Sequence, residues 1–517
     1  MSRISSWSPR RRSGRWAIRF PLNNARTRGL PERGSRRSLF NPRKSTSDGG
    51  SKDTMEDDIK EMYAKAKKAF EEYQYWPQER VDEVVQAVGW IWQKEEVRKV
   101  LARTAVDESG IGVYEDKLAK IRTKTLGTLW DQRGVKTCDL VEEDKVRGIR
   151  KYAKPIGVVA DVVPCTNPES TICCIGLSTL KTRNAMIVSP HPRTQKSSYL
   201  TVEYGREALK KIGAPVDLLQ CIKNTSQAKT QELMAYCDFA VATGGAALVK
   251  VVYAAGKPAQ TVGAGNVVSF VDETVPDLQA TARKIMLSKI ANNAASCSSE
   301  NAVALHASIY DKMIECLKKE GGYLCSTAER ETLRKCMWPD GKTLNRDIVA
   351  HSAKFIADLA GIKVPETTKF LMVIGEKIGR EDRFSGEKIS PVLTVWKWSD
   401  FDEMLDRLEK ILEFSGKGHS VSIHTELDER RVKLALRAKV GRVVCNMGHT
   451  AANSGGWGSG LTFTDTLGCG TWAGNITSEN VNWQHFLNYT QVSMPIKEHI
   501  PADEELFGDY LKKWGKD

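Results

Sequence analysis

The residue of this sequence best suited to act as a nucleophile is Cys297. It lies in the polar segment NNAASCSSEN (292–301), between a segment with helical periodicity and a short apolar run. The reactive form of cysteine is the thiolate, which a polar loop with nearby backbone N–H groups favours and which apolar surroundings disfavour. The segment is therefore compatible with a reactive thiol that could form a covalent bond with a substrate, but by itself it does not establish a catalytic role for one of twelve cysteines.

The other cysteines do not form a recognisable pattern. They are scattered along the chain without a CxxC pair, and several lie in apolar runs where cysteine acts as a small buried hydrophobe. Scattered thiols in a long chain indicate a reducing compartment rather than a disulfide framework. Since no Cys/His cluster has the spacing of a zinc site, we expect no metal.

Elements with the periodicities of strands and helices alternate around this cysteine. Apolar runs at 158–163, 185–188, 238–242 and 267–271 predict strands, and helical segments separate them. Thr274 is expected to cap the last of these helices, which runs to residue 290. The alternation predicts a doubly wound α/β domain of the Rossmann type, and it restarts after Cys297 as a second α/β domain.

A glycine turn follows one of the expected strands. Thr243, Gly244 and Gly245 stand where the chain leaves the 238–242 strand and opens a helix. Glycines at such a point let the backbone approach a pyrophosphate, whose charge the helix N-terminus favours. An ordinary glycine turn remains the alternative at this stage.

Composition limits the classes of function. The 517 residues are 41% hydrophobic and 27% charged, which is typical of globular proteins. No apolar run approaches the roughly 18 residues of a membrane span. The formal charge of +13 is concentrated in residues 1–54, where 14 basic and 3 acidic residues give +11, so the remainder is nearly neutral and need not bind nucleic acid.

The basic segment 1–54 is expected to be an unstructured tail. A mitochondrial transit peptide and a nucleic-acid-binding arm are the alternatives, the second being the weaker because no aromatic platform accompanies the charge. We therefore expect a cytoplasmic protein, or a mitochondrial-matrix protein if the tail is a transit peptide.

The order of short motifs between residues 154 and 472 resembles the acylating, coenzyme A-dependent branch of the aldehyde dehydrogenase family. The resemblance covers the chain from about residue 55 to the C-terminus. The motifs are KPIGVVA (154–160), VPCTNP (163–168), LKTRNA (180–185), SPHPR (189–193), ATGG (242–245), GKP (256–258), VGAGN (262–266), SCSSE (296–300) and LGCGTW (467–472).

This resemblance implies three catalytic residues. Cys297 would attack the aldehyde carbon and become a thioester after hydride transfer. The amide of Asn167, with the backbone N–H of Cys297, would stabilise the oxyanion, although an Asn before Pro168 is also common in turns. His419 matches a histidine of acylating enzymes, with a hydrogen-bonded structural histidine as the alternative.

The resemblance also implies a nucleotide site. Its residues would be Thr166, Ser189, His191, Pro192, Arg193, Thr243, Gly244, Gly245, Gly263 and Glu387, the last holding the nicotinamide ribose. Many relatives carry a Glu in the adenosine-side segment that excludes a 2′-phosphate. Because this chain lacks it there and has Arg193 and Lys196 nearby, NADP is as plausible as NAD.

One departure from the wider family favours coenzyme A as the acyl acceptor. Hydrolytic members carry a Glu-Leu-Gly-Gly segment whose Glu activates water, and the matching segment TVGAGN (261–266) has no carboxylate. Because general-base help is worth about 10²–10⁴-fold, water attack should be slow, whereas a thiolate does not need that help. A hydrolytic enzyme remains the weaker alternative.

The expected aldehyde is small and anionic. The segments FSGEKISP (384–391) and SCSSEN (296–301) resemble acylating sulfoacetaldehyde dehydrogenases, and VYEDKLAK (113–120) equally resembles succinate-semialdehyde enzymes. An acetaldehyde dehydrogenase is a further alternative. The polar segment NMGHTAANS (446–454), with His449, Thr450, Asn453 and Ser454, is expected to line the substrate funnel and bind the anion.

The domain plan follows from these assignments. Residues 55–294 should form the NAD(P)-binding domain, with an oligomerisation strand near 145–153, and residues 295–475 the catalytic domain. Residues 476–517 should form a C-terminal oligomerisation segment. An exposed strand of this kind usually finds a partner, so we expect a homodimer or homotetramer.

Overall fold

The computed structural model describes residues 58–515. The basic tail expected at 1–54, with its transit-peptide and nucleic-acid alternatives, lies outside these residues. The described part begins with four helices whose apolar residues recur at helical spacing, as Ile59, Ala66 and Tyr73 do on the buried face of the first. They are α1 (Ile59–Tyr73), α2 (Gln78–Gln93), α3 (Glu95–Ser109) and α4 (Tyr114–Asp131).

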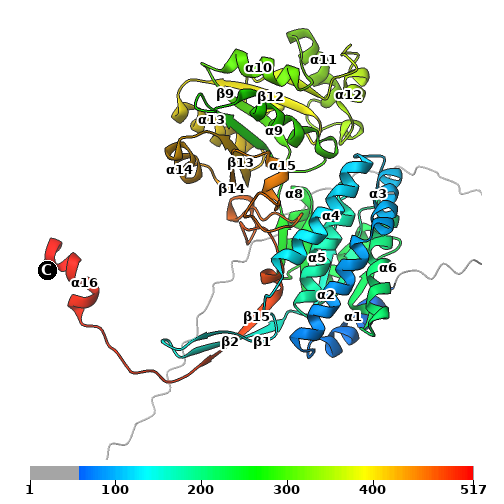
Figure 1. Cartoon of the computed structure of the whole chain (residues 1–517), viewed down its shortest axis with the longest axis vertical. Coiled ribbons are helices and arrows are strands. Elements are labelled where there is room, and N and C mark those ends of the chain that lie inside the picture. The colour runs from blue at the N-terminus through cyan, green and yellow to red at the C-terminus, as the bar shows by residue number, and fades with distance from the viewer. Residues whose placement is uncertain (1–57, 516–517) are drawn as a thin grey trace, which may run out of the picture. The chain divides into compact units, whose positions relative to one another are not determined.

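The first sheet is parallel and has five strands in the order β5-β4-β3-β6-β7. All residues of its central strand are buried, as expected when helices cover both faces of a sheet. Figure 1 shows α2, α4, α5 and α6 side by side. The elements are β3 (Val158–Val162), α5 (Pro168–Lys181), β4 (Ala185–Ser189), α6 (Gln195–Lys211), β5 (Leu219–Cys221), α7 (Gln227–Tyr236), β6 (Phe239–Thr243), α8 (Ala246–Ala254) and β7 (Ala259–Val262).

The second sheet is also parallel and has seven strands in the order β10-β11-β12-β9-β8-β13-β14. They are β8 (Val267–Val271), β9 (Glu300–His306), β10 (Gly322–Leu324), β11 (Phe370–Ile374), β12 (Val392–Trp398), β13 (Gly418–His424) and β14 (Val440–Cys445). Strand β8 was expected in the nucleotide-binding domain, but it pairs with β9 and β13. The sheets therefore divide before Val267 rather than at 295, because hydrophobic periodicity does not reveal which sheet a strand joins.

Alternate residues of β9 pack into two different cores. Ala302 and Ala304 face the core that contains α13, whereas Val303 and Leu305 face the core that contains α9 and α10. The helices of this region are α9 (Leu278–Ile290), α10 (Tyr310–Lys319), α11 (Thr327–Met337), α12 (Ala353–Leu359), α13 (Phe401–Phe414), α14 (Asp428–Arg437) and α15 (His449–Asn453).

The cap of α9 differs from the sequence prediction. Asp277 is the N-cap, and its carboxylate accepts a hydrogen bond from the Ala280 N–H (2.9 Å). Thr274 lies earlier and donates its hydroxyl to Asp272 Oδ1 (2.6 Å). Asp and Thr are both good N-cap residues, so the sequence alone did not show which of them begins the helix.

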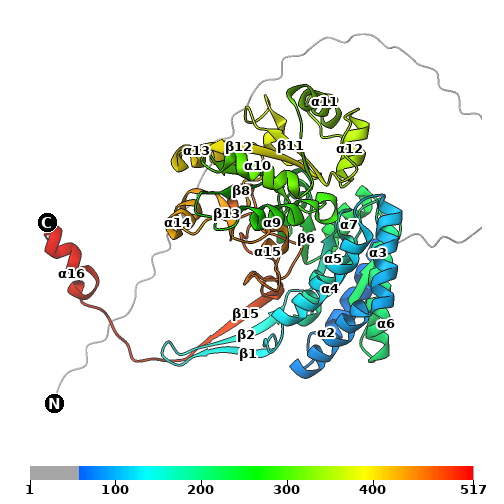
Figure 2. The same cartoon turned by 45° about the horizontal axis from the view of Figure 1, so that its top comes forward.

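Two segments that are far apart in the chain form a third, antiparallel sheet. Its strand order is β1 (Asp139–Asp144), β2 (Ile149–Pro155) and β15 (Leu487–Ser493), and Figure 2 shows the three side by side. Strand β15 is an edge strand with exposed side chains. The helix after it, α16 (Asp503–Trp514), has no buried residue. None of the helices in residues 58–515 is long and apolar enough to cross a membrane.

Candidate active site

The loop that carries Cys297 lies where the first sheet meets the second. After α9 the chain turns sharply through a 3-10 segment, Ala291–Ala294, in which Asn292 and Asn293 adopt positive φ angles of 51° and 52°. Asparagine tolerates this left-handed region better than most residues do. Cys297 follows, immediately before β9. Gly265 packs on this loop so closely that an added Cβ would lie 2.1 Å from the Cys297 carbonyl oxygen, so only glycine fits there.

The Cys297 thiol contacts a buried histidine. His419 Nε2 lies 3.1 Å from Cys297 Sγ, and His419 Nδ1 lies 2.7 Å from the Ser420 hydroxyl. Burial, helped by the charge of Arg442, holds the pKa of His419 well below its usual value. The imidazole is therefore neutral at physiological pH. In the tautomer that donates Nδ1–H to Ser420, Nε2 is an acceptor for the thiol proton.

The structure corrects the expectation that the polar loop by itself favours a thiolate. Burial, with a smaller contribution from the negative charge of Glu387, raises the pKa of the Cys297 thiol to about 12. The loop is polar in sequence, but the rest of the protein surrounds it and removes the solvent that would stabilise an anion. Cys297 therefore needs a base when it reacts, and His419 is in contact with it.

Arg442 lies behind this pair and is only 5% exposed. Its Nη2 donates to the carbonyl oxygens of His419 and Gly468, each at 2.9 Å. Its Nη1 donates to the Ser478 carbonyl (3.1 Å) and to Asn480 Oδ1 (3.2 Å). All these acceptors are neutral, so the positive charge of Arg442 remains effective beside His419 and the thiol.

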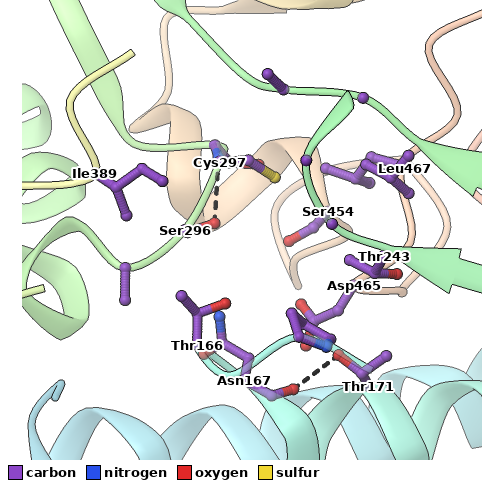
Figure 3. A pocket seen from close by; sticks show the side chains of 18 of the residues that line it. Thr166, Asn167, Thr171, Thr243, Ser296, Cys297, Ile389, Ser454, Asp465 and Leu467 are labelled. Atoms are coloured by element: carbon purple, nitrogen blue, oxygen red, sulfur yellow. Dashed lines mark hydrogen bonds between the residues drawn. The ribbon is translucent and has the colours of Figure 1, made fainter. Parts of the chain in front are cut away.

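Asn167 is held in an orientation that suits an oxyanion donor. It precedes α5, is 6% exposed, and receives a 3.4 Å hydrogen bond from Asn292 Nδ2 on its side-chain oxygen Oδ1. Its Nδ2 is thereby turned into the pocket. Figure 3 shows this nitrogen facing Cys297 across the pocket. Asn292 is fixed in turn by the Val113 N–H, which donates to its Oδ1 at 2.7 Å. No local pattern in the sequence indicates this role of Asn292.

Two connected cavities meet at this site. The smaller has about 180 Å³ and contains Cys297. The larger is a groove of about 550 Å³ over the first sheet. They share the wall formed by Pro164 and Thr243–Gly245, so a molecule in the groove could reach the thiol. Of the predicted residues, the smaller cavity is lined by Thr166, Asn167, Thr243, Gly244, Gly245, Gly263, Cys297 and Glu387, and the groove by His191, Pro192, Thr243, Gly244 and Gly245.

Two predicted nucleotide-binding residues do not line either cavity. Ser189 is fully buried, and its hydroxyl is 2.8 Å from that of Thr230. The Arg193 guanidinium donates to the Ser109 carbonyl oxygen instead of reaching into the groove. Ser189 therefore supports the wall of the groove, and Arg193 fixes the end of α3 to the loop before α6.

Glu387 lines the cavity beside the thiol. Its Oε1 accepts a hydrogen bond from the Gly265 N–H (3.1 Å), and burial raises the pKa of the carboxyl to about 7. The only other carboxylate among the described lining residues is Asp465, and both of its oxygens are engaged. Oδ1 pairs with Lys120 at 3.0 Å, and Oδ2 accepts from the Ser170 hydroxyl at 2.5 Å.

The polar segment 446–454 has a different role from the expected one. His449 and Asn453 are fully buried and hold the Cys297 loop: His449 Nδ1 is 2.7 Å from the Ser298 carbonyl oxygen, and Asn453 Nδ2 donates to Ser298 Oγ at 2.9 Å. Thr450 bonds to Ser288. Only Ser454 of this segment lines the cavity, because the others face α9 and the Cys297 loop.

A glutamate from an unexpected element lies at the start of α6. The Glu108 carboxylate, from α3, accepts hydrogen bonds from the N–H groups of Lys196 (2.7 Å) and Ser197 (2.9 Å) and from the Ser197 hydroxyl (3.0 Å). The adenosine-side segment itself lacks a Glu, and Glu108 was not among the predicted site residues. The two helices are distant in sequence, and no local pattern joins them.

Nothing in residues 58–515 resembles a metal site, since no three His, Cys, Asp or Glu side chains are grouped to hold an ion. All twelve cysteines are free.

Comparison with known proteins places these features in a family. Residues 31–324 match the model of the aldehyde dehydrogenase family. The chain is 44% identical to a sulfoacetaldehyde dehydrogenase of Acholeplasma sp, covering 87% of this chain and 93% of the relative. It is 41% identical to a sulfoacetaldehyde dehydrogenase (acylating) of Bilophila wadsworthia, covering 89% and 99%. It is 37% identical to a succinate-semialdehyde dehydrogenase (acetylating) of Clostridium kluyveri, covering 87% and 99%.

Solved structures give the same result. An acetylating aldehyde dehydrogenase from Geobacillus thermoglucosidasius superposes with a TM-score of 0.82 and is 32% identical, covering 86% of this chain and 98% of that one. A propionaldehyde dehydrogenase from Rhodopseudomonas palustris, solved with bound CoA and an acylated cysteine, gives 0.76 and is 26% identical, covering 85% and 97%.

Proposed function

The chain belongs to the aldehyde dehydrogenase family, and from this premise we propose that it is a coenzyme A-acylating aldehyde dehydrogenase. It converts an aldehyde, CoA and NAD(P)⁺ into an acyl-CoA and NAD(P)H, and catalyses the reverse reduction. The observation that carries the proposal is the 3.1 Å contact between Cys297 Sγ and His419 Nε2, beside a 261–266 segment that has no carboxylate.

Acylation begins with proton transfer from the Cys297 thiol to His419 Nε2 as the sulfur attacks the aldehyde carbon. Asn167 Nδ2 and the Cys297 N–H donate to the oxygen that becomes negatively charged. When bound, NAD(P)⁺ supplies the hydride acceptor. Loss of hydride from the carbon leaves a thioester on Cys297, and the proton on His419 is released to solvent.

Deacylation uses the same histidine in the reverse direction. Neutral His419 takes the proton of the CoA thiol, whose sulfur adds to the thioester carbon. The tetrahedral intermediate then expels Cys297, which recovers the proton from His419. Water competes poorly: the 261–266 segment has no carboxylate, both oxygens of Asp465 are engaged, and Glu387 is assigned to the nicotinamide ribose.

The groove over the first sheet fits a dinucleotide. Its floor is apolar, with Leu248 and Val251, and α8 begins at its edge with Gly245 as N-cap. An added Cβ at Gly245 would meet nothing within 4 Å, so space is open for a phosphate in front of the helix N-terminus. Glu387, in the wall of the smaller cavity beside Cys297, would hold the nicotinamide ribose.

NAD is the proposed cofactor in preference to NADP. The adenine ribose of a doubly wound domain lies near the end of the second strand, which here is β4, followed by the loop to α6. Glu108 already occupies the N–H groups that open α6, and its negative charge repels a 2′-phosphate. Arg193, which favoured NADP in the sequence, is bound to Ser109.

Sulfoacetaldehyde is the proposed substrate, with succinate semialdehyde as the second candidate. A cavity of about 180 Å³ admits a short aldehyde and leaves no room for a long aliphatic chain. Lys120 of α4 lies in the cavity wall, and Lys124 of the same helix, which contacts no carboxylate in residues 58–515, donates to Ser454 in that wall. Sulfonate and carboxylate groups both need such charge when they leave water.

A homodimer or homotetramer is the proposed assembly. Strand β15 has an unpaired edge, and α16 exposes Leu506, Phe507, Tyr510 and Trp514. Unpaired edges and exposed apolar residues usually pair with a second chain. The twelve free cysteines support a cytoplasmic location.

The direct test is the CoA dependence of NAD(P)H formation with sulfoacetaldehyde. The wild-type enzyme and a Cys316→Ser control should turn over continuously only when CoA is present and stop after about one NADH per active site without it, whereas Cys297→Ser should be inactive with a normal melting temperature. A Cys297→Ser enzyme that keeps wild-type turnover would exclude this nucleophile. Equal turnover without CoA would instead show a hydrolytic enzyme.

A further inference from the structure

We propose that Lys124 and Ser454 form the site that binds the anionic end of the aldehyde and selects sulfonate or carboxylate substrates over neutral ones. The inference rests on the proposed function and assigns residues to its substrate specificity. Neither residue takes part in the reaction steps at the carbonyl carbon.

Ser454 presents a hydroxyl to the cavity of Cys297. It follows α15, and it lines the cavity together with Cys297, Asn167 and Asp465. Figure 3 shows its hydroxyl directed into the space between Cys297 and Asp465. A substrate whose aldehyde carbon lies at the thiol would therefore place its far end near Ser454.

Lys124 determines which way this hydroxyl donates. Its Nζ donates to Ser454 Oγ at 2.7 Å, to the Ser454 carbonyl oxygen, and to the Gly455 carbonyl oxygen at 3.5 Å. Because an ammonium only donates, the Ser454 oxygen must act as the acceptor. Its proton then has no acceptor among residues 58–515 and is free for an oxygen of the substrate.

The charge of Lys124 is not neutralised by a carboxylate in contact with it. Of the neighbouring cations, Lys117 pairs with Glu169, and Lys120 pairs with Asp465. Lys124 is 4% exposed, and its acceptors are neutral oxygens. Asp465 and Asp131 act on this charge electrostatically without a hydrogen bond to it, so a positive charge removed from water lies next to the Ser454 hydroxyl.

The ionisation of these groups agrees with this charge balance. Burial works to raise the pKa of Asp465, but Lys120, Lys124 and the Ser170 hydroxyl outweigh it, and the pKa is lowered. Asp465 is therefore ionised and engaged by Lys120. Burial lowers the pKa of Lys124, opposed mainly by Asp465. An anion bound at Ser454 would add a second negative charge and favour the ammonium form of Lys124.

A purely structural role for Lys124 is the competing explanation. Its bonds to the carbonyl oxygens of Ser454 and Gly455 could simply fix the chain after α15. That role would affect every aldehyde equally. Anion binding would affect anionic aldehydes alone, so the ratio of two substrates separates the explanations.

The test compares kcat/KM for sulfoacetaldehyde and for propionaldehyde in wild type, Lys124→Met, Lys124→Arg and Ser454→Ala. Lys99→Met, which removes an exposed lysine paired with Glu95 on α3, is the matched control. We expect Lys124→Met to lower the ratio of sulfoacetaldehyde to propionaldehyde by at least about 30-fold, mainly through KM, as when one partner of a buried charge pair is removed. Ser454→Ala should lower it about 10-fold, and Lys124→Arg should restore part of it.

Each outcome has a defined meaning. An unchanged ratio in Lys124→Met and Ser454→Ala overturns the inference, and so does a wild-type enzyme that prefers propionaldehyde. If Lys124→Met does not fold, as judged by its melting temperature, the ratio in Ser454→Ala decides. Failure of the proposed function looks different: the wild type would then show no CoA-dependent oxidation of any aldehyde.

Discussion

Replacing His419 by Ala should remove the base that activates Cys297. The high pKa of the thiol shows why the reaction needs this base. Burial raises that pKa to about 12, so at pH 7.5 only about one thiol in 30,000 is ionised without help. A positioned base that takes the proton during attack contributes about 10²–10⁴-fold. His419→Ala should therefore slow acylation by a factor in that range.

The pH dependence makes this prediction specific to the base. The pKa of His419 is well below 6.5, so in the wild type the imidazole is neutral and able to accept a proton throughout pH 7–10. Its acylation rate should therefore be nearly flat over that interval. In His419→Ala the rate depends on the small thiolate fraction, which increases about tenfold per pH unit below a pKa of about 12. The variant should recover steeply as the pH rises.

The assay is the pre-steady-state burst of NADH, measured without CoA so that deacylation does not contribute. His499→Ala is the control, because His499 is exposed and pairs only with Glu505. Alkylation of Cys297 by iodoacetamide, followed by peptide mass spectrometry, gives the thiol reactivity independently. A wild-type burst rate in His419→Ala, or a loss that stays constant from pH 7 to 10, would refute a role for His419 as the base.

Three further predictions concern the cofactor, the oxyanion and the assembly. Glu108→Gln keeps a hydrogen-bond acceptor but removes the negative charge at the start of α6. The ratio of kcat/KM with NADP to kcat/KM with NAD should therefore rise about tenfold, equivalent to about 1.4 kcal/mol. An unchanged ratio would show that Glu108 does not determine the choice of cofactor. Asn292→Ala frees the Asn167 amide to rotate. Steady-state kinetics should show kcat lowered about 10–100-fold with little change in KM. A change in KM alone would contradict the role of Asn292 in orienting Asn167. Truncation after residue 486 removes β15 and α16 and should give monomers by light scattering, whereas an unchanged oligomer would place the interface elsewhere.

The sequence pointed to Cys297 as the nucleophile through the order of many motifs rather than through one cysteine. The same evidence named Asn167, Thr243–Gly245 and Glu387, and all of them line the cavity of Cys297. His419 was harder to assign, because a histidine in a buried strand is usually structural. Its role depends on the 3.1 Å contact with a residue more than a hundred positions away.

The errors share one cause, which is that tertiary packing changes the meaning of a local pattern. A polar loop suggested a thiolate, but burial raises the pKa of Cys297. The donors of 446–454 suggested an anion site, yet His449 and Asn453 face the Cys297 loop. Conversely, Lys120 and Lys124 occur on a helix where charged residues usually form a solvated face, but in the fold Lys120 lines the cavity and Lys124 is buried against Ser454, which also lines it.

The central claim is that an acyl group passes through Cys297 to coenzyme A. It is tested most directly by mixing the enzyme with sulfoacetaldehyde and NAD⁺ and determining the mass of the Cys297 peptide before and after CoA is added. Without CoA, NADH formation should stop after about one turnover per active site, with the acyl group on Cys297. Addition of CoA should release it as acyl-CoA. Sustained turnover without CoA, or an unmodified Cys297 during that turnover, would contradict the account.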